Sequence, residues 1–82
     1  MNQNPQVRLL AEVASDIRRN WKNVWFGAVP YLDAMQTMNS VDEDYGMDSG
    51  RSIVAYFLSN ATTWKGEDAR RIKLELKTML KR

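Results

Sequence analysis

Apolar residues recur every three or four positions over residues 5–22, with Arg8, Glu12 and Arg19 on the opposite side. This repeat is typical of an amphipathic helix that buries one face. Asn4 can cap such a helix and Pro5 can occupy its first turn. We therefore predict a first helix over about residues 5–22. Its apolar face, which continues into the following linker, consists of Val7, Leu10, Val13, Ala14, Ile17, Trp21, Val24 and Trp25.

A second, shorter helix is predicted over about residues 29–38. It follows an aromatic hinge at residues 25–31, and Pro30 is tolerated at the start of a helix. Tyr31, Leu32, Met35 and Met38 then form a short apolar stripe. Residues 39–50 are dense in turn-forming residues, so we expect a long loop there, and long loops in small domains are often functional.

The most apolar run of the chain covers residues 49–60, and the pattern favours a buried central helix. Asp48 and Ser49 are both suitable N-caps for it. Ile53, Val54, Phe57, Leu58 and Ala61 make up its expected buried stripe. A short apolar run of this length is also compatible with a buried strand. We prefer the helix because no partner strand is evident elsewhere.

A last helix is predicted from either Trp64 or Glu67 to the end of the sequence. Acidic residues at its start and basic residues at its end complement the helix dipole. Four-residue spacing suggests the pairs Glu67–Arg71 and Arg71–Glu75. The buried face would consist of Ala69, Ile72, Leu76, Met79 and Leu80. The whole pattern predicts one all-α domain over residues 1–82, a compact bundle of about four short helices.

The composition argues against most catalytic and metal chemistry. The chain contains neither Cys nor His, which removes disulfides, the usual zinc ligands, the Cys nucleophile and the commonest general base. Asp42, Asp44 and Asp48 have the alternating spacing of a calcium loop, but Met47 and Ile53 occupy the positions that need Gly and Glu. We therefore expect a non-enzymatic protein without a metal or other cofactor.

No apolar run approaches the length of a membrane span, and the first residues lack the pattern of a secretion signal. We therefore expect a cytoplasmic protein that does not act at a membrane.

Charge is distributed unevenly despite a net charge of only +2. Residues 31–50 carry acidic side chains and no basic ones, and residues 65–82 are mainly basic. Such asymmetry bears on partners rather than on fold. Trp25, Tyr45 and Trp64 lie in or beside linkers, where we expect them to be half exposed. Our preferred hypothesis is an accessory or regulatory module that binds a protein partner through Asp42, Glu43, Asp44, Tyr45 and the adjacent Trp64.

The alternative hypothesis is a nucleic-acid-binding module that uses the basic face of the last helix. A basic stripe beside an aromatic residue is suited to a phosphate backbone. The residues concerned are Lys65, Arg70, Arg71, Lys73, Lys77 and Lys81. A homodimer is a further possibility, because an 82-residue chain buries only a modest fraction of its surface.

Overall fold

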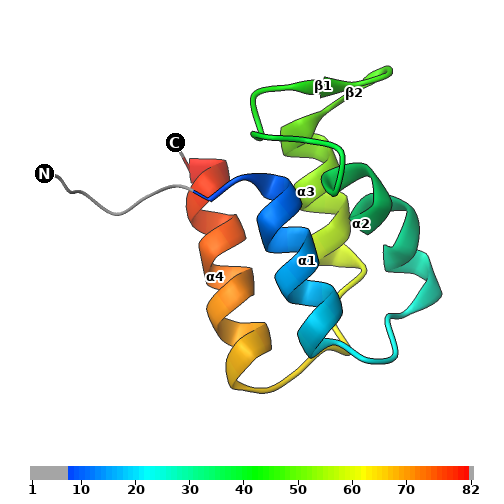
Figure 1. Cartoon of the computed structure of the whole chain (residues 1–82), viewed down its shortest axis with the longest axis vertical. Coiled ribbons are helices and arrows are strands. Elements are labelled where there is room, and N and C mark those ends of the chain that lie inside the picture. The colour runs from blue at the N-terminus through cyan, green and yellow to red at the C-terminus, as the bar shows by residue number, and fades with distance from the viewer. Residues whose placement is uncertain (1–7, 82) are drawn as a thin grey trace, which may run out of the picture.

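The computed structural model describes residues 8–81, and it confirms the predicted all-α bundle of four helices (Figure 1). A single 3₁₀ turn and a very short hairpin complete the described part. The helices are α1 (Leu10–Asn20), α2 (Val29–Met35), α3 (Gly50–Ser59) and α4 (Glu67–Lys81). The smaller elements are η1 (Phe26–Ala28), β1 (Asp44–Tyr45) and β2 (Asp48–Ser49).

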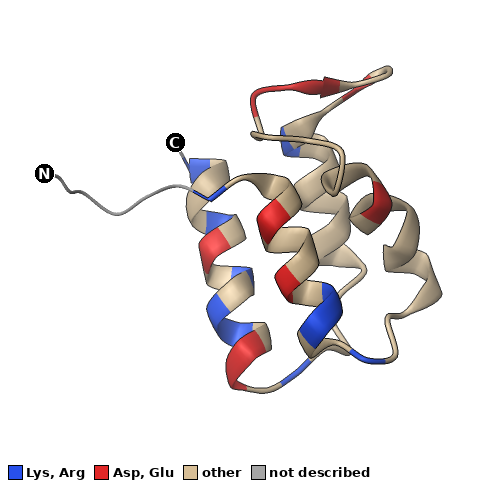
Figure 2. Cartoon of the chain, viewed as in Figure 1, with Lys and Arg blue, Asp and Glu red and all other residues tan. Residues whose placement is uncertain are grey.

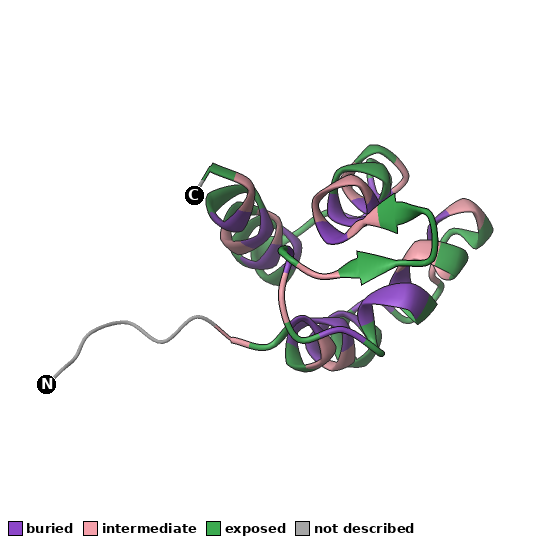
Figure 3. Ribbon diagram, turned by 90° about the horizontal axis from the view of Figure 1, so that it is seen from above, coloured by how far each residue is buried: buried purple, intermediate pink, exposed green. Residues whose placement is uncertain are grey.

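Helix α3 packs against both α2 and α4, and α1 packs against the same two helices from the other side. The view from above shows the buried positions of the helices turned toward the centre of this arrangement (Figure 3). Each helix contributes the apolar face that its periodicity predicted. The largest fully buried side chains are Phe57, Leu10, Ile17, Leu32, Met35, Met38, Ile72, Leu76, Val13 and Val54.

The observed helices are shorter than predicted at several ends. Helix α1 begins at Leu10 and ends at Asn20, so Arg8 precedes it. The expected opening at Asn4 and Pro5 lies outside the described residues. Helix α2 ends at Met35 instead of residue 38. After it, the N–H groups of Thr37 and Met38 bond to carbonyls three residues back, as in a 3₁₀ turn, instead of four. Of the two predicted starts for the last helix, residue 67 is the observed one.

Backbone groups of the loop after α2 satisfy the start of α1. The Leu10 N–H donates to the Asn39 carbonyl at 3.1 Å, and the Ala11 N–H donates to the Met38 carbonyl at 3.0 Å. The Leu9 N–H donates to the Glu12 carboxylate at 3.0 Å. These bonds matter because the first N–H groups of a helix have no partner within it. They connect α1 to a segment that is distant in sequence.

The central run is the helix α3, so the strand alternative is wrong for these residues. Ser49 is its cap, and the Ser49 hydroxyl accepts a bond from the Ser52 N–H at 3.1 Å. Asp48 instead belongs to strand β2. The first helical residue, Gly50, donates its N–H to the Glu43 carbonyl at 2.6 Å. The loop therefore presses directly on the start of α3.

The expected loop at residues 39–50 contains an antiparallel hairpin that sequence analysis did not predict. Asp44 pairs with Ser49, and Tyr45 pairs with Asp48. Gly46, at a φ of 61°, takes the left-handed conformation that a tight hairpin turn requires. The hairpin stands above the N-terminal end of α3, at one end of the molecule (Figure 1).

An aromatic cluster closes the opposite end of the core. The rings of Trp21 and Trp64 stack with 5.3 Å between centroids and only 6° between planes. Phe57 meets Trp21 edge to face, at 6.2 Å between centroids. Trp64 lies in the linker before α4, so this cluster packs that linker against the end of α1. Aromatic pairs of this kind stabilise a fold beyond the area that they bury.

The buried Asp16 joins α1 to α4 through two arginines. Its carboxylate lies 3.1 Å from an Arg8 nitrogen and 3.4 Å from an Arg71 nitrogen. Arg8 also reaches Glu75 of α4 at 2.6 Å, and Arg71 reaches Asp68 at 3.2 Å. Arginine forks suit such shared carboxylates because they present several donors in one plane. Ion pairs therefore line the edge of the core between α1 and α4.

This network replaces the ion pairs that four-residue spacing suggested. Arg71 is paired with Asp68 and Asp16, rather than with Glu67 and Glu75. Arg71 keeps a pair along its own helix, with Asp68 three residues back, and adds the contact with Asp16 across the helix interface, while Glu75 is engaged by Arg8.

We expect Gly50→Ala to destabilise the protein, although alanine is normally the better helix residue. A Cβ at this position would lie 2.7 Å from the Val41 carbonyl oxygen and 2.9 Å from that of Glu43. The free energy of unfolding should fall by about 1–3 kcal/mol, as for other overpacked sites. Urea denaturation would measure it, with the exposed Ser59→Ala in the same helix as the control. Equal stability of the two variants would contradict this account of the close contact.

We expect Asp16→Asn to lower the free energy of unfolding by about 1–3 kcal/mol near neutral pH. Burial by itself raises the pKa of Asp16, but the bonds from Arg8 and Arg71 outweigh it, so the net pKa is lowered. A carboxyl group with a lowered folded-state pKa stabilises the fold above its ordinary pKa. This stabilisation is lost as the pH falls through the folded-state value.

The difference between wild type and Asp16→Asn should therefore shrink on acidification. Denaturation at about pH 6 and about pH 3 would measure the change. The control is Asp33→Asn, which breaks an exposed pair with Arg18 and should cost under about 1 kcal/mol. A difference for Asp16→Asn that grows toward acid pH would exclude the ionic role.

Candidate functional site

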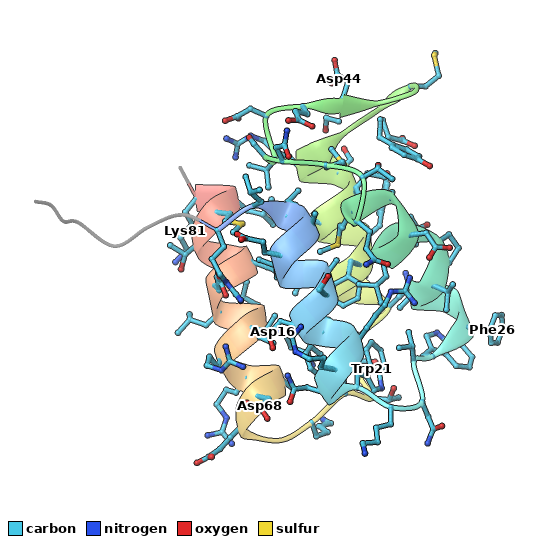
Figure 4. The ribbon with its side chains drawn as sticks, in the orientation of Figure 1. Asp16, Trp21, Phe26, Asp44, Asp68 and Lys81 are labelled. Atoms are coloured by element: carbon cyan, nitrogen blue, oxygen red, sulfur yellow. The ribbon has the colours of Figure 1, made fainter. Side chains whose placement is uncertain are left out.

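The acidic loop that sequence analysis selected is partly occupied by contacts within the chain. Asp42 forms an ion pair with Arg51 at 2.9 Å. Glu43 accepts a bond from the Asn39 N–H at 3.1 Å. Asp44 and Tyr45 remain exposed on the hairpin, and Figure 4 shows Asp44 pointing away from the bundle. Asp42 is also exposed although its carboxylate is paired, so Glu43 is the one member of these four that is partly buried.

Trp64 does not lie beside the acidic loop, and the expectation that it is half exposed is wrong. Trp64 is only 4% exposed, because it stacks on Trp21. Figure 4 shows Trp21 at the end of the molecule opposite to Asp44 of the hairpin. The expectation for the other two linker aromatics is confirmed, since Trp25 and Tyr45 are about half exposed. The group expected to form one surface is thus divided between the two ends of the molecule.

In residues 8–81, the calcium-like spacing does not bring its carboxylates together as metal ligands. Within residues 8–81, no cluster of three or more Asp, Glu, His or Cys side chains has the arrangement of metal ligands. Asp42, the first position of the calcium-like spacing, is instead engaged by Arg51. The same guanidinium donates to the Leu80 carbonyl at 3.1 Å, so it ties the loop to the end of α4.

The basic residues of the last helix divide between two sides. Arg71 faces α1, where it meets Asp16, and it is therefore separated from the rest of the predicted nucleic-acid site. By helical periodicity, Arg70, Lys73, Lys77 and Lys81 lie on the other side. We call these four, with Lys65, the basic α4 surface.

Lys73 is the most constrained member of the basic α4 surface. Its ammonium donates to the Trp64 carbonyl at 2.6 Å. Burial lowers the pKa of Lys73, and the positive charges of Lys65 and Lys77 lower it further. An open cavity of about 290 Å³ lies at this end of α4. It is lined by Trp64, Lys65, Gly66, Ala69, Arg70 and Lys73.

A second candidate surface was missed by sequence analysis, and it is aromatic. Trp25 and Phe26 contact each other at 4.3 Å between ring centroids, and they are 46% and 75% exposed. Tyr31 of α2 and Tyr56 of α3 contact each other at 5.5 Å, with Tyr56 48% exposed. We call these four residues the aromatic surface. Figure 4 shows Phe26 projecting from the edge of the bundle.

The turn η1 connects the two aromatic pairs. A Cβ on Gly27 would lie 2.5 Å from the Trp25 indole nitrogen and 2.9 Å from the Asn60 side-chain oxygen. Asn60 in turn donates its side-chain N–H to the Tyr56 carbonyl at 2.9 Å. The hinge therefore packs closely on the end of α3, which carries Tyr56.

The sequence did contain a signal for the aromatic surface. Residues 23–32 and 52–64 include no charged side chain. Figure 2 shows the corresponding absence of charge along η1 and the first turn of α2. This pattern reads equally well as buried core, because an apolar run does not say which of its members face solvent.

No family model, curated protein or solved structure matches this chain. None of the helices in the described part of the chain has both the length and the apolar character needed to cross a membrane. The aromatic surface and the basic α4 surface are therefore the features of this chain that point to a function.

Acrylamide should quench mainly the fluorescence of Trp25, because the other two indoles are stacked inside the fold. Trp25→Phe should therefore remove most of the quenching of the folded protein, measured as the Stern–Volmer slope. Trp64→Phe serves as the matched control and should retain it. Loss of quenching in the control variant, with Trp25→Phe unaffected, would contradict the observed burial of Trp64.

Proposed function

We propose that this protein is a non-enzymatic accessory or regulatory module that acts by protein–protein interaction, with the aromatic surface as its contact surface. The observation that carries the proposal is two pairs of contacting aromatic side chains, Trp25 with Phe26 and Tyr31 with Tyr56, on stretches of the chain that carry no charged residue. Aromatic residues are enriched at the energetic centres of protein interfaces, and they lose little conformational entropy on binding.

The size of the surface supports this proposal. The exposed parts of Trp25, Phe26 and Tyr56 amount to on the order of 400 Å². A stable interface buries about 800 Å² on each partner. These three side chains would therefore supply about half of the area that this protein buries in such an interface. That is enough for an apolar centre surrounded by polar contacts.

The partner is best described by the character of this surface. We propose a protein with an apolar, weakly charged docking site, so the affinity should change little with salt. Asp44 and Tyr45 are retained as a second proposed contact, because both are exposed on the hairpin. Asp42, Glu43 and Trp64 are less suitable, because the chain itself engages or buries them.

A photo-reactive phenylalanine analogue at position 26 should cross-link the partner in cells that naturally make the protein. The matched control carries the analogue at Thr78, an exposed position on α4 that lies outside the aromatic surface. A product specific to position 26 would identify the partner by mass spectrometry. Products of equal yield at both positions would contradict a defined contact surface. A product that is only the dimer of this chain would contradict the accessory role and identify a homodimer interface.

With the partner purified, Phe26→Ser and Tyr56→Ser should each weaken binding by about tenfold or more, as truncation of an interface centre does. Leu74→Ser is the control, since Leu74 is a 65% exposed apolar residue on the outer side of α4. Its affinity should stay within about twofold of wild type. Calorimetry would measure the dissociation constants. The proposal fails if the control variant loses as much affinity as the two aromatic variants.

A further inference from the structure

The two sides of α4 differ in whether their charged side chains form ion pairs. On the side facing α1, Asp68 and Glu75 are paired with Arg71 and Arg8. On the opposite side, within residues 8–81, none of the five cations of the basic α4 surface has a carboxylate oxygen within 4.0 Å. The ion pairs with Arg71 and Arg8 therefore engage the carboxylates on one side of the helix, whereas the other side carries five cations and the single exposed carboxylate of Glu67.

The unpaired cations form a row instead of a single cluster. Arg70, Lys73, Lys77 and Lys81 are spaced three, four and four residues apart, so they extend along α4 for about 16 Å. Lys65 adds a charge beside the cavity at the start of the helix. One phosphate ion is too small to meet such a row. A linear polyanion with regularly spaced charges matches it.

The position of Lys73 provides a physical reason for binding such a ligand. Its bond to the Trp64 carbonyl holds the ammonium near Lys65, and like charges held close together repel each other. A bound phosphate would relieve this repulsion. Leu74, exposed in the same row, adds an apolar contact that a stacked base or sugar can cover.

We propose that the basic α4 surface binds the phosphate backbone of a nucleic acid, without reading its sequence. Backbone binding needs only a row of cations, whereas sequence reading needs polar side chains that reach base edges. The exposed side of α4 carries mainly Lys and Arg, which fits the first mode. This proposal is independent of the aromatic surface, because the two share no residue.

Fluorescence anisotropy of the full chain with labelled single-stranded and duplex DNA, of about 20 nucleotides or base pairs, would test the proposal at two salt concentrations. Four phosphate contacts predict a slope of about −3 to −4 in a plot of log affinity against log salt. The affinity should accordingly fall by about 60-fold or more between about 50 and 200 mM salt. No binding of either DNA at the lower salt concentration would overturn the proposal.

The double variant Arg70→Gln/Lys77→Gln should weaken binding by about tenfold at low salt and reduce the slope by about 2. The matched control is Arg19→Gln/Lys22→Gln, which removes the same net charge at the end of α1 and should change affinity by less than about threefold. Equal losses for the two double variants would overturn the proposal, because they would show that only net charge matters.

Two further ligands separate nucleic acid from other polyanions. Polyglutamate of similar length and vesicles containing anionic lipid should bind much more weakly than DNA at the same salt concentration. Binding of either with the affinity of DNA would overturn the assignment to nucleic acid. Phe26→Ser should leave DNA binding unchanged, so failure of the protein-binding proposal and failure of this one are distinguishable.

Discussion

The rest of this structure depends on one constraint: the first backbone N–H groups of α1 and α3 have no acceptor within their own helix and need one elsewhere. Residues 38–43 supply carbonyls to both: Met38 and Asn39 serve α1, and Glu43 serves the start of α3 at Gly50. A buried helix start without such partners would cost several kcal/mol of stability. Because one segment bonds to the starts of both helices, it constrains their relative position in addition to the side-chain packing between them.

The two candidate surfaces consist of charged and aromatic side chains that the contacts inside the fold do not engage. Asp16 draws Arg8 and Arg71 into the interface between α1 and α4, which leaves the opposite side of α4 basic. Trp21 and Trp64 close one end of the core. Trp25 and Tyr56 are exposed, and both lie on stretches of the chain without charged residues. Exposed aromatic rings in such a region indicate a contact surface more strongly than scattered apolar residues do.

Periodicity was sufficient to predict the helices, since Ile53 and Phe57 face the core as their spacing requires. It failed for Trp64, because a linker residue has no periodic neighbours, and the ring that buries it is far away in the sequence. The hairpin was missed because strands of two residues are too short to show alternation. The predicted site was wrong in grouping Trp64 with the acidic loop. The two segments flank α3, and the segments before and after a helix lie at its opposite ends.

The closure of α1 onto α4 also has a consequence for the order of folding. The Arg71–Asp16 bond joins residues 55 positions apart, and the Arg8–Glu75 bond joins residues 67 positions apart. Closing a longer loop costs more chain entropy, so we expect these contacts to form after the more local pairing of α2 with α3. Interactions made late contribute little to the transition state. We therefore expect the ion pairs between α1 and α4 to slow unfolding more than they speed folding, so that they set how long the folded bundle persists.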